Sequence, residues 1–234
     1  MLPDLAASAL DNPIWAALTS EQKYLSQTSE LARRFPAEVT PLAGFAEPSK
    51  EAYRSLLNLV RPEETVALFL REPPESSDAW FVKLTPLLQM VDADKSSAEP
   101  TSDPPKYELI KLGAADSPEM LALAQLTKPG PFGTRTHELG EYFGIRVDGA
   151  LVAMAGERLH FTGHTEVSAV CTHPNHLGRG HAGALVAKVV SSIRQRGEVA
   201  ILHVRADNAR AIGVYERLGF KPRLEYHVVV MERK

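Results

Sequence analysis

The apolar residues after position 180 are spaced as on one face of a helix. Steps of three and one separate Ala182, Leu185, Val186, Val189, Val190 and Ile193. Gly197 stands where a helix C-cap is expected. The nearly all-apolar run 199–204 predicts a strand covered on both faces, and residues 166–171 predict the strand before the helix. Two strands joined by a helix in this way are expected to be parallel.

The rest of the second half predicts further strands and helices. Residues 142–147 and 150–155 are two expected strands, joined at Asp148-Gly149, a strong hairpin signal. Further strands are expected at 107–112 and 226–231, and further helices at 116–126 and 208–218. Residues 128–133 combine prolines with glycines and predict a shaped loop.

The first half alternates helical and strand patterns but contains no glycine-rich loop and no catalytic constellation. Helices are expected after Asp11-Asn12-Pro13, over 21–35 and, capped by Ser49, over 50–60. Strands are expected at 39–45, 65–70, 79–84 and 87–91. Residues 92–106 hold no large apolar side chain, so we interpret them as a linker. The predicted organisation is an N-terminal accessory domain, 1–91, a linker, 92–106, and a second α/β domain, 107–234.

Composition narrows the class of protein. Hydrophobic residues make up 44% and charged residues 24% of the 234 residues, which is typical of a globular protein. The net charge of -3 gives no general signature of polyanion binding, so no nucleic-acid partner is expected. The single cysteine excludes an intrachain disulfide. The start of the chain lacks the features of a secretory signal, and no apolar run could span a bilayer, so we expect a cytoplasmic protein without a membrane partner.

The loop between the strand at 166–171 and the following helix is a candidate anion site. It reads Leu177-Gly178-Arg179-Gly180-His181-Ala182. The first N–H groups of a helix lack partners within the helix, and glycines let a ligand approach the backbone closely. From the loop alone, an ordinary strand-to-helix turn explains the pattern equally well. His173, His176 and His181 are poorly spaced for a metal, and none is expected. A nucleotide site is disfavoured because no Gly-Lys-Ser/Thr follows the loop.

Several segments around this loop share one pattern. They are Thr-Glu-Val-Ser-Ala-Val-Cys-Thr-His-Pro (165–174), the loop 177–182, Leu-His-Val (202–204), Asn208 and Ala-Ile-Gly-Val-Tyr-Glu-Arg-Leu-Gly-Phe (211–220). In this combination the chain resembles the GCN5-related N-acetyltransferase (GNAT) superfamily, and more closely its FR47-like branch. The resemblance covers about residues 107–234 and implies a mixed central sheet flanked by helices. The first half would then be a variable α/β extension or a degenerate second copy of the same fold.

The resemblance implies direct transfer of an acetyl group from acetyl-CoA to an amine on a small molecule or a peptide. The N–H groups of residues 177–182 would hold the CoA pyrophosphate. The pantetheine arm would lie along Val170, Cys171 and Thr172, and Asn208 and Ala211 would contact it from the next helix. Asn208 also fits a helix N-cap. The family has Arg or Gln where this chain has Leu177, which motivates the alternative of a catalytically weak acyl-CoA-binding or regulatory module.

The family positions also suggest catalytic residues. Tyr215 is the candidate general acid for the departing thiolate, and core packing is its alternative role. Glu166 is the candidate base, acting through water, or else a solvated carboxylate at a strand end. Strand alternation predicts that Glu166, Ser168 and Val170 share a face. Guesses for the acceptor site are Phe132, Arg135 and Tyr226, and Cys171 is expected to be a packed thiol.

Overall fold

The computed structural model describes residues 9–74, 79–93 and 107–234, so most of the expected linker lies outside the described residues. The helices are α2 (Pro13–Thr19), α3 (Lys50–Leu57), α4 (Ser117–Thr127), α5 (His181–Gln195) and α6 (Ala209–Arg217). Short 3-10 turns lie at Lys23–Leu25, Ala114–Asp116, Thr136–Leu139 and Pro174–His176. The strands are β1 (Gln27–Ser29), β2 (Ala32–Arg34), β3 (Ala43–Phe45), β4 (Thr65–Leu70), β5 (Trp80–Asp92), β6 (Ile110–Leu112), β7 (Tyr142–Val147), β8 (Ala150–Phe161), β9 (His164–Thr172), β10 (Val199–Arg205) and β11 (Phe220–Arg233).

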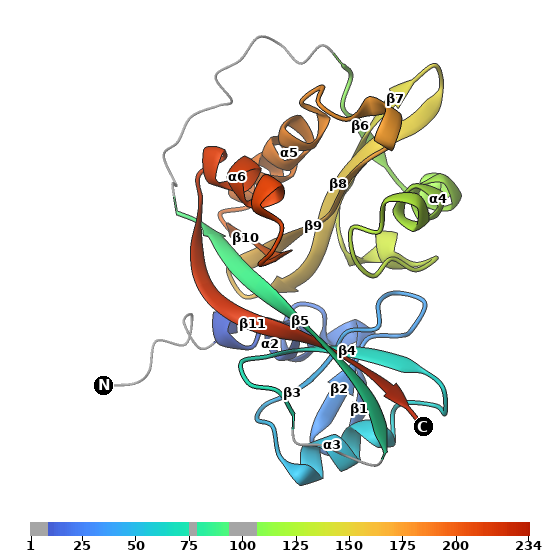
Figure 1. Ribbon diagram of the computed structural model, residues 1–234, viewed down its shortest axis with the longest axis vertical. Helices are drawn as coiled ribbons and strands as arrows, with labels where there is room; N and C mark the ends of the chain where they lie inside the picture. Colours follow the sequence, from blue (N-terminus) through green and yellow to red (C-terminus); the bar gives the residue numbers. More distant parts are fainter. Residues whose placement is uncertain (1–8, 75–78, 94–106) are drawn as a thin grey trace.

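One mixed sheet of eight strands runs through both halves of the chain, in the order β4-β11-β5-β10-β9-β8-β7-β6 (Figure 1). Its strands β9 and β10 are parallel, and α5 forms the crossover between them, as predicted. Every other neighbouring pair in this sheet is antiparallel. The fold is therefore α/β with a mixed central sheet flanked by helices, which confirms the fold class.

The strand β5 comes from the first half of the chain but lies between β10 and β11 of the second half. Both expected strand ranges, 79–84 and 87–91, lie in the single strand β5, which continues through Pro86. The pairing of β5 with β10 ends at Leu87. No strand therefore lies on the side toward which an N–H group of residue 86 would point, and proline is tolerated there. The carbonyl of Pro86 accepts a hydrogen bond from the N–H of Ala206 (3.1 Å). Both halves of the chain thus share one sheet.

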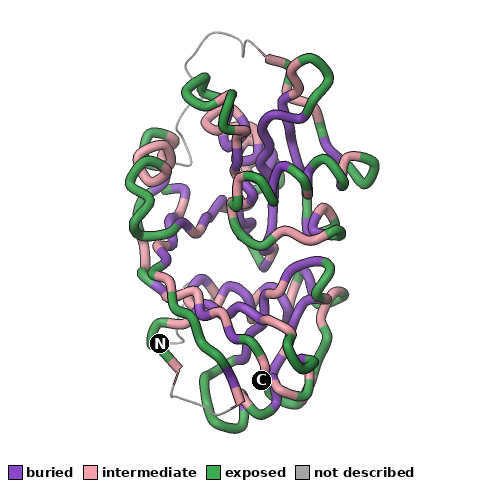
Figure 2. Tube along the Cα trace, turned by 45° about the vertical axis from the view of Figure 1, so that its right-hand side comes forward, coloured by how far each residue is buried: buried purple, intermediate pink, exposed green. Residues whose placement is uncertain are grey.

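Helices cover the two faces of this sheet differently. On one face, α5 packs its predicted apolar stripe, including Leu185 and Ile193, against sheet residues such as Ile145 and Leu202. The other face is covered by α4 next to β8 and β9, and by α2 next to β8. Figure 2 shows the buried residues concentrated along the central strands and the exposed residues along the outer loops and helices.

The N-terminal segment forms a second, three-stranded sheet in the order β1-β2-β3. The predicted helix over 21–35 is wrong. Its helical spacing came partly from Tyr24 and Leu31, which are 74% and 47% exposed and form no buried face. The segment instead pairs as β2 with β1 and β3, and its buried Arg34 pairs with Glu64 (2.9 Å). Ser49 caps α3 by accepting a hydrogen bond from the N–H of Ala52 (3.1 Å), as predicted.

Polar contacts also join the two halves. The last residue of β5, Asp92, accepts two hydrogen bonds from Arg194 on α5 (2.7 and 2.8 Å). The buried Gln22 donates to the carbonyls of Leu139 (3.2 Å) and Arg158 (2.7 Å). The expected domain division stays a prediction, but the sheet and these contacts make the two halves one structural unit.

We expect the two halves to unfold together, because β5 is part of the sheet of the second half. The two tryptophans, Trp15 and Trp80, report on the first half, and the single cysteine, Cys171, which is buried, reports on the second. In a urea titration, tryptophan fluorescence and the reactivity of Cys171 toward a thiol reagent should give coincident midpoints. Reactivity of Cys171 at urea concentrations that leave the tryptophan signal native would contradict a shared sheet.

Candidate functional site

The loop before α5 presents a row of unpaired backbone N–H groups. Gly178 and Gly180 have φ values of 76° and 82°, in the left-handed region that suits glycine. Among the described residues, no hydrogen-bond acceptor faces the N–H groups of 178–183, and α5 has no side-chain cap. A Cβ added at either glycine would meet no atom within 4 Å, so the space beside the loop is open. These groups and the helix dipole fit a bound pyrophosphate.

The strands on either side of α5 separate close to this loop. The parallel pairing of β9 with β10 ends at Leu202 opposite Val167. Past that point β9 contains a bulge, where three residues span the distance that two span on β8, and Ala169 has a φ of 52°. From Ser168 to Thr172, β9 therefore has no strand partner on its β10 side. A gap between two diverging strands gives an extended ligand access to free backbone groups.

The bulge changes which side chains share a face of β9. Val167 and Val170 both pack against the cluster that contains α5, although they are three residues apart, whereas Cys171 packs on the α4 side. The prediction that Glu166, Ser168 and Val170 share one face is therefore wrong, because the extra residue reverses the alternation.

Glu166 is fully buried and held by two side chains. Its carboxylate accepts hydrogen bonds from Arg158 Nε and Nη2 (2.8 and 2.5 Å) and from His203 Nδ1 (2.7 Å). Burial by itself would raise the pKa of Glu166, but the charge of Arg158 and the hydrogen bonds from Arg158 and His203 outweigh it and lower that pKa to about 2. The carboxylate is therefore ionised and a weak proton acceptor. The alternative of a solvated carboxylate is wrong, and the role of general base stays a prediction.

Further polar residues extend from this pair across neighbouring strands. Gln89 Nε2 lies 3.1 Å from His203 Nε2 and donates to the carbonyl of Leu10 (2.9 Å). Its Oε1 accepts from Arg223 (2.8 Å), which also pairs with Asp11 (2.6 Å). We call Arg158, Glu166, His203, Gln89 and Arg223 the polar chain; they lie on the adjacent strands β8, β9, β10, β5 and β11. Sequence reasoning missed all of it except Glu166. The available signal was polar residues inside the apolar runs 87–91 and 199–204.

The helix α6 places Asn208 and Tyr215 close to the gap. Asn208 Oδ1 accepts from the N–H of Ala211 (3.1 Å), which confirms its N-cap role. Tyr215 packs against the α5 cluster, as do Val170 and Ala211. Its hydroxyl has no hydrogen-bond partner within the described ranges, and burial raises its pKa to about 12. Tyr215 thus combines the packing role with a protonated, unpaired hydroxyl.

The three guesses for the acceptor site lie in different surroundings. Phe132 is half-buried, contacts Tyr142 edge-on (5.9 Å between ring centroids) and lines a hollow of 260 Å³ next to α4. Arg135 is exposed and donates twice to Glu138 (2.7 and 2.8 Å). Tyr226 is buried, and its hydroxyl donates to the carbonyl of Leu10 (2.8 Å), so it packs in the core. Phe132 lines this hollow, whereas Arg135 and Tyr226 do not.

Cys171 is buried on the α4 side of β9. Burial raises the pKa of its thiol to about 11, which disfavours the reactive thiolate. This environment matches the expectation of a packed thiol.

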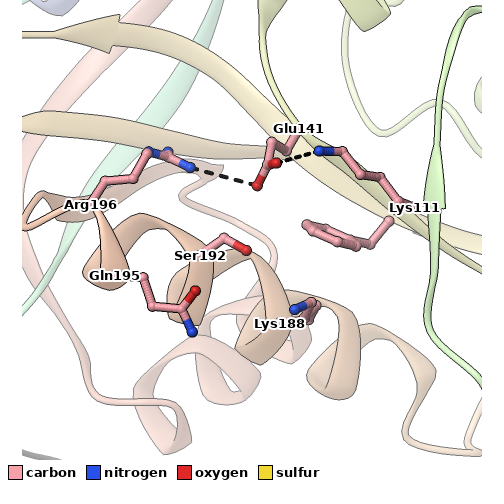
Figure 3. A pocket seen from close by; sticks show the side chains of 7 residues that line it. Lys111, Glu141, Lys188, Ser192, Gln195 and Arg196 are labelled. Carbon is pink, nitrogen blue, oxygen red and sulfur yellow. Dashed lines mark hydrogen bonds and ion pairs between the residues drawn. The ribbon is translucent and has the colours of Figure 1, made fainter.

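Another hollow lies elsewhere, beside the C-terminal half of α5 (Figure 3). It measures 400 Å³ and is lined by Lys111, Glu141, Phe143, Lys188, Ser192, Gln195 and Arg196. Glu141 pairs there with Lys111 (2.6 Å) and Arg196 (3.6 Å). None of the residues predicted from sequence lines this hollow, so we place the candidate site at the loop and the strand gap.

The histidines of the loop region pack against one another. The ring centroids are 5.7 Å apart for His173 and His176, and 6.4 Å apart for His176 and His181. His181 is buried, and burial lowers its pKa. The part of the chain that the structure describes contains no group of His, Cys, Asp or Glu arranged to hold a metal ion. Nor do these residues include a helix long and apolar enough to cross a membrane.

Replacing Glu166 by Gln should destabilise the protein at neutral pH and less so in acid. The variant leaves Arg158 without a buried counter-charge, which typically costs about 3–5 kcal/mol. Because the folded pKa is depressed, the contribution of Glu166 is present above about pH 4.5 and is lost as the pH falls toward about 2. Urea unfolding of both proteins between pH 7 and pH 3 measures the difference. Glu225→Gln, at an exposed position, is the matched control. Equal stability of the two variants at pH 7 would contradict the role of Glu166 as the buried counter-charge of Arg158.

Comparisons with known proteins bear on this geometry. The family model described as FR47-like protein matches residues 142–229, from β7 into β11. A search of curated proteins finds no match. A solved structure from Novosphingobium aromaticivorans, assigned as an acetyltransferase of the GNAT family, is 37% identical, with a TM-score of 0.87 over 96% of this chain and 98% of that one.

More distant structures share the fold. A GCN5-related N-acetyltransferase from Kribbella flavida is 17% identical, with a TM-score of 0.63 over 98% of this chain and 95% of that one. A GCN5-related N-acetyltransferase-like protein from Streptococcus suis is 15% identical, with a TM-score of 0.61 over 98% of both chains. Together with the 37% identical relative, the loop and strand gap lead to one conclusion: this chain belongs to the GCN5-related N-acetyltransferase family.

Proposed function

We propose that this protein transfers an acetyl group from acetyl-CoA to an amine by direct attack. The observation that carries the proposal is the row of unpaired N–H groups at residues 178–183, next to the gap between β9 and β10. A long ligand with an anionic segment and an extended, amide-containing arm fits such a site. Family membership supports the same reaction class.

Each part of the site has a proposed share in binding. The N–H groups from Gly178 onward hold the pyrophosphate, and the exposed Arg179 adds positive charge beside them. The backbone groups of Val170 and Thr172 that point to the β10 side bind the pantetheine arm, which passes along Cys171 between them. Asn208 and Ala211 approach the arm from the start of α6.

Tyr215 is proposed to stabilise the departing thiolate by hydrogen bonding. Bound acetyl-CoA would supply a thioester whose carbon accepts the amine nitrogen while its bond to sulfur breaks. The pKa of Tyr215, raised to about 12, lies well above the ~8.5 of an ordinary thiol. Complete proton transfer from Tyr215 to the thiolate is therefore not favoured. Donating a hydrogen bond is the favourable role for Tyr215, and solvent supplies the final proton to the thiol.

The amine is proposed to reach the thioester already deprotonated, and the proton that its nitrogen loses as the amide forms passes to solvent. Glu166 could take its proton, but the low pKa of that carboxylate makes it a weak base. We therefore propose that Glu166 contributes fixed negative charge and holds Arg158 and His203 in place. Phe132, which lies on the α4 side together with Cys171, is the proposed contact for the acceptor.

One observation favours a second candidate function. Leu177 is 50% exposed at the loop position where the resemblance leads us to expect Arg or Gln, which fits a weak acyl-CoA-binding module. Calorimetry with CoA, acetyl-CoA and ATP tests binding, and thiol release with a panel of amines tests transfer. Binding of CoA without thiol release from any amine would favour the module. Absence of CoA binding at ~1 mM would contradict both functions, since each requires a bound CoA ligand.

Gly180→Ala should weaken CoA binding by about tenfold or more, because the methyl group occupies the open space where the phosphates are proposed to lie. Gly197→Ala, at the other end of α5, is the matched control. Gly197 also has a positive φ, 78°, and open space beside it, so alanine there adds the same backbone strain. Both variants should lose similar stability, and only Gly180→Ala should lose affinity in calorimetry. Equal affinities for the two variants would show that the phosphates lie elsewhere.

Tyr215→Phe should lower kcat by about 10- to 100-fold and leave CoA affinity within about twofold, because the hydroxyl acts on the transition state. Tyr53→Phe is the matched control. Like Tyr215, Tyr53 has a buried, unpaired hydroxyl, and burial raises the pKa of Tyr53 to about 12. Tyr53, however, lies on α3 and packs in a different hydrophobic cluster. Steady-state kinetics and calorimetry of both variants measure the two effects. Parallel losses of turnover and affinity in Tyr215→Phe would leave Tyr215 with a packing role alone.

A further inference from the structure

The donors and acceptors of the polar chain fix how His203 carries its proton. The carbonyl of Leu10 can only accept, so the Gln89 atom 2.9 Å from it is the amide nitrogen. The guanidinium of Arg223 can only donate, so the atom 2.8 Å from it is the amide oxygen. The nitrogen of Gln89 therefore donates to His203 Nε2 (3.1 Å), and His203 Nδ1 carries the proton that binds Glu166 (2.7 Å).

The ring of His203 is also fixed by packing. Its side chain is completely buried. Its ring centroid lies 4.7 Å from that of Phe69 on β4 and 5.9 Å from that of Tyr226 on β11. With aromatic neighbours on two strands and hydrogen bonds at both ring nitrogens, the imidazole is held in one orientation. Two of these contacts, Phe69 and Gln89, come from the first half of the chain.

The bond between His203 and Glu166 lies where β9 and β10 part. Pairing of the two strands ends at Leu202 opposite Val167, the residues adjacent to His203 and Glu166. Past this point β9 carries the proposed arm-binding residues 170–172. On the other side of the gap, β10 continues through residues 206–208 into α6, which carries Tyr215. The cross-strand bond thus sets the spacing between Tyr215 and the arm-binding residues.

We propose that His203 and Gln89 are positioning residues for acyl transfer: Gln89 fixes the tautomer of His203, and His203 joins β10 to Glu166 on β9 where the strands diverge. The inference rests on the proposed function. It gives the first half of the chain a direct part in the geometry of the reaction, although neither residue touches the reacting atoms.

Gln89→Met tests the effect on turnover, because methionine keeps the size of the side chain and removes its hydrogen bonds. Thr165→Val is the matched control, since it removes another buried side-chain bond on β9, from Thr165 to Glu198 (2.6 Å). We expect kcat of Gln89→Met to fall by about tenfold or more, with CoA affinity within about threefold, because small misplacements of reacting groups are costly. Thr165→Val should keep its turnover. Equal turnover in the two variants would overturn the proposal.

The tautomer gives a readout that does not depend on activity. Two-bond proton–nitrogen spectra of protein labelled with ¹⁵N-histidine should show His203 protonated at Nδ1 and not at Nε2. In Gln89→Glu, a second variant that keeps a polar side chain, carboxylates flank the ring on both sides, and both nitrogens should be protonated. A proton on Nε2 alone in the wild type would overturn the proposal. Absence of thiol release in all proteins, together with the expected tautomer, would refute the proposed function and leave this arrangement standing.

Discussion

The buried negative charge of Glu166 imposes requirements that reach across most of the sheet. An uncompensated carboxylate in the interior costs several kcal/mol, so its oxygens must be filled by donors. Arg158 and His203 fill them. His203 then needs a donor at its second nitrogen, and Gln89 supplies it. Gln89 in turn needs an acceptor for its other N–H and a donor for its oxygen, which are Leu10 and Arg223. One charge therefore fixes side chains on adjacent strands from β8 to β11.

These requirements explain why the first half of the chain is more than a flanking unit. Its strand β5 separates β10 from β11 and carries Gln89. The same half anchors the loop before β7: the N–H of Arg135 donates to the carbonyl of Glu38 (3.0 Å), and Thr136 Oγ1 donates to that of Val39 (2.5 Å). At Gly133 a Cβ would lie 2.2 Å from the carbonyl oxygen of Glu38, so the loop needs glycine there. Both the proposed acyl-transfer side and the proposed acceptor side of the site thus depend on residues before 92.

Local signals in the sequence predicted local structure well. Asp148-Gly149 gave the hairpin of β7 and β8, Asn208 gave the cap of α6, and the stripe on α5 gave the packing of that helix. The failures are non-local. The bulge at Ala169 reverses the faces of β9 through a single extra residue that no composition signal marks. Pro86 is tolerated inside β5 because the pairing with β10 stops at Leu87, and the sequence does not show where that pairing stops. The polar chain was missed because its partners are up to 134 residues apart.

The structure indicates that Leu177, in place of the Arg or Gln of the family, has less effect on anion binding than the sequence alone suggests. In this loop the unpaired groups are backbone N–H groups, and any residue except proline supplies one. The left-handed backbone at Gly178 and Gly180 is what directs those groups, and both glycines are retained. An Arg or Gln side chain at position 177 would add one hydrogen bond to the anion. The position is half-exposed, and screening by water makes such bonds weak there. Affinity for an anion should therefore depend mainly on the two glycines and the first turn of α5, so the identity of residue 177 would tune binding more than decide it.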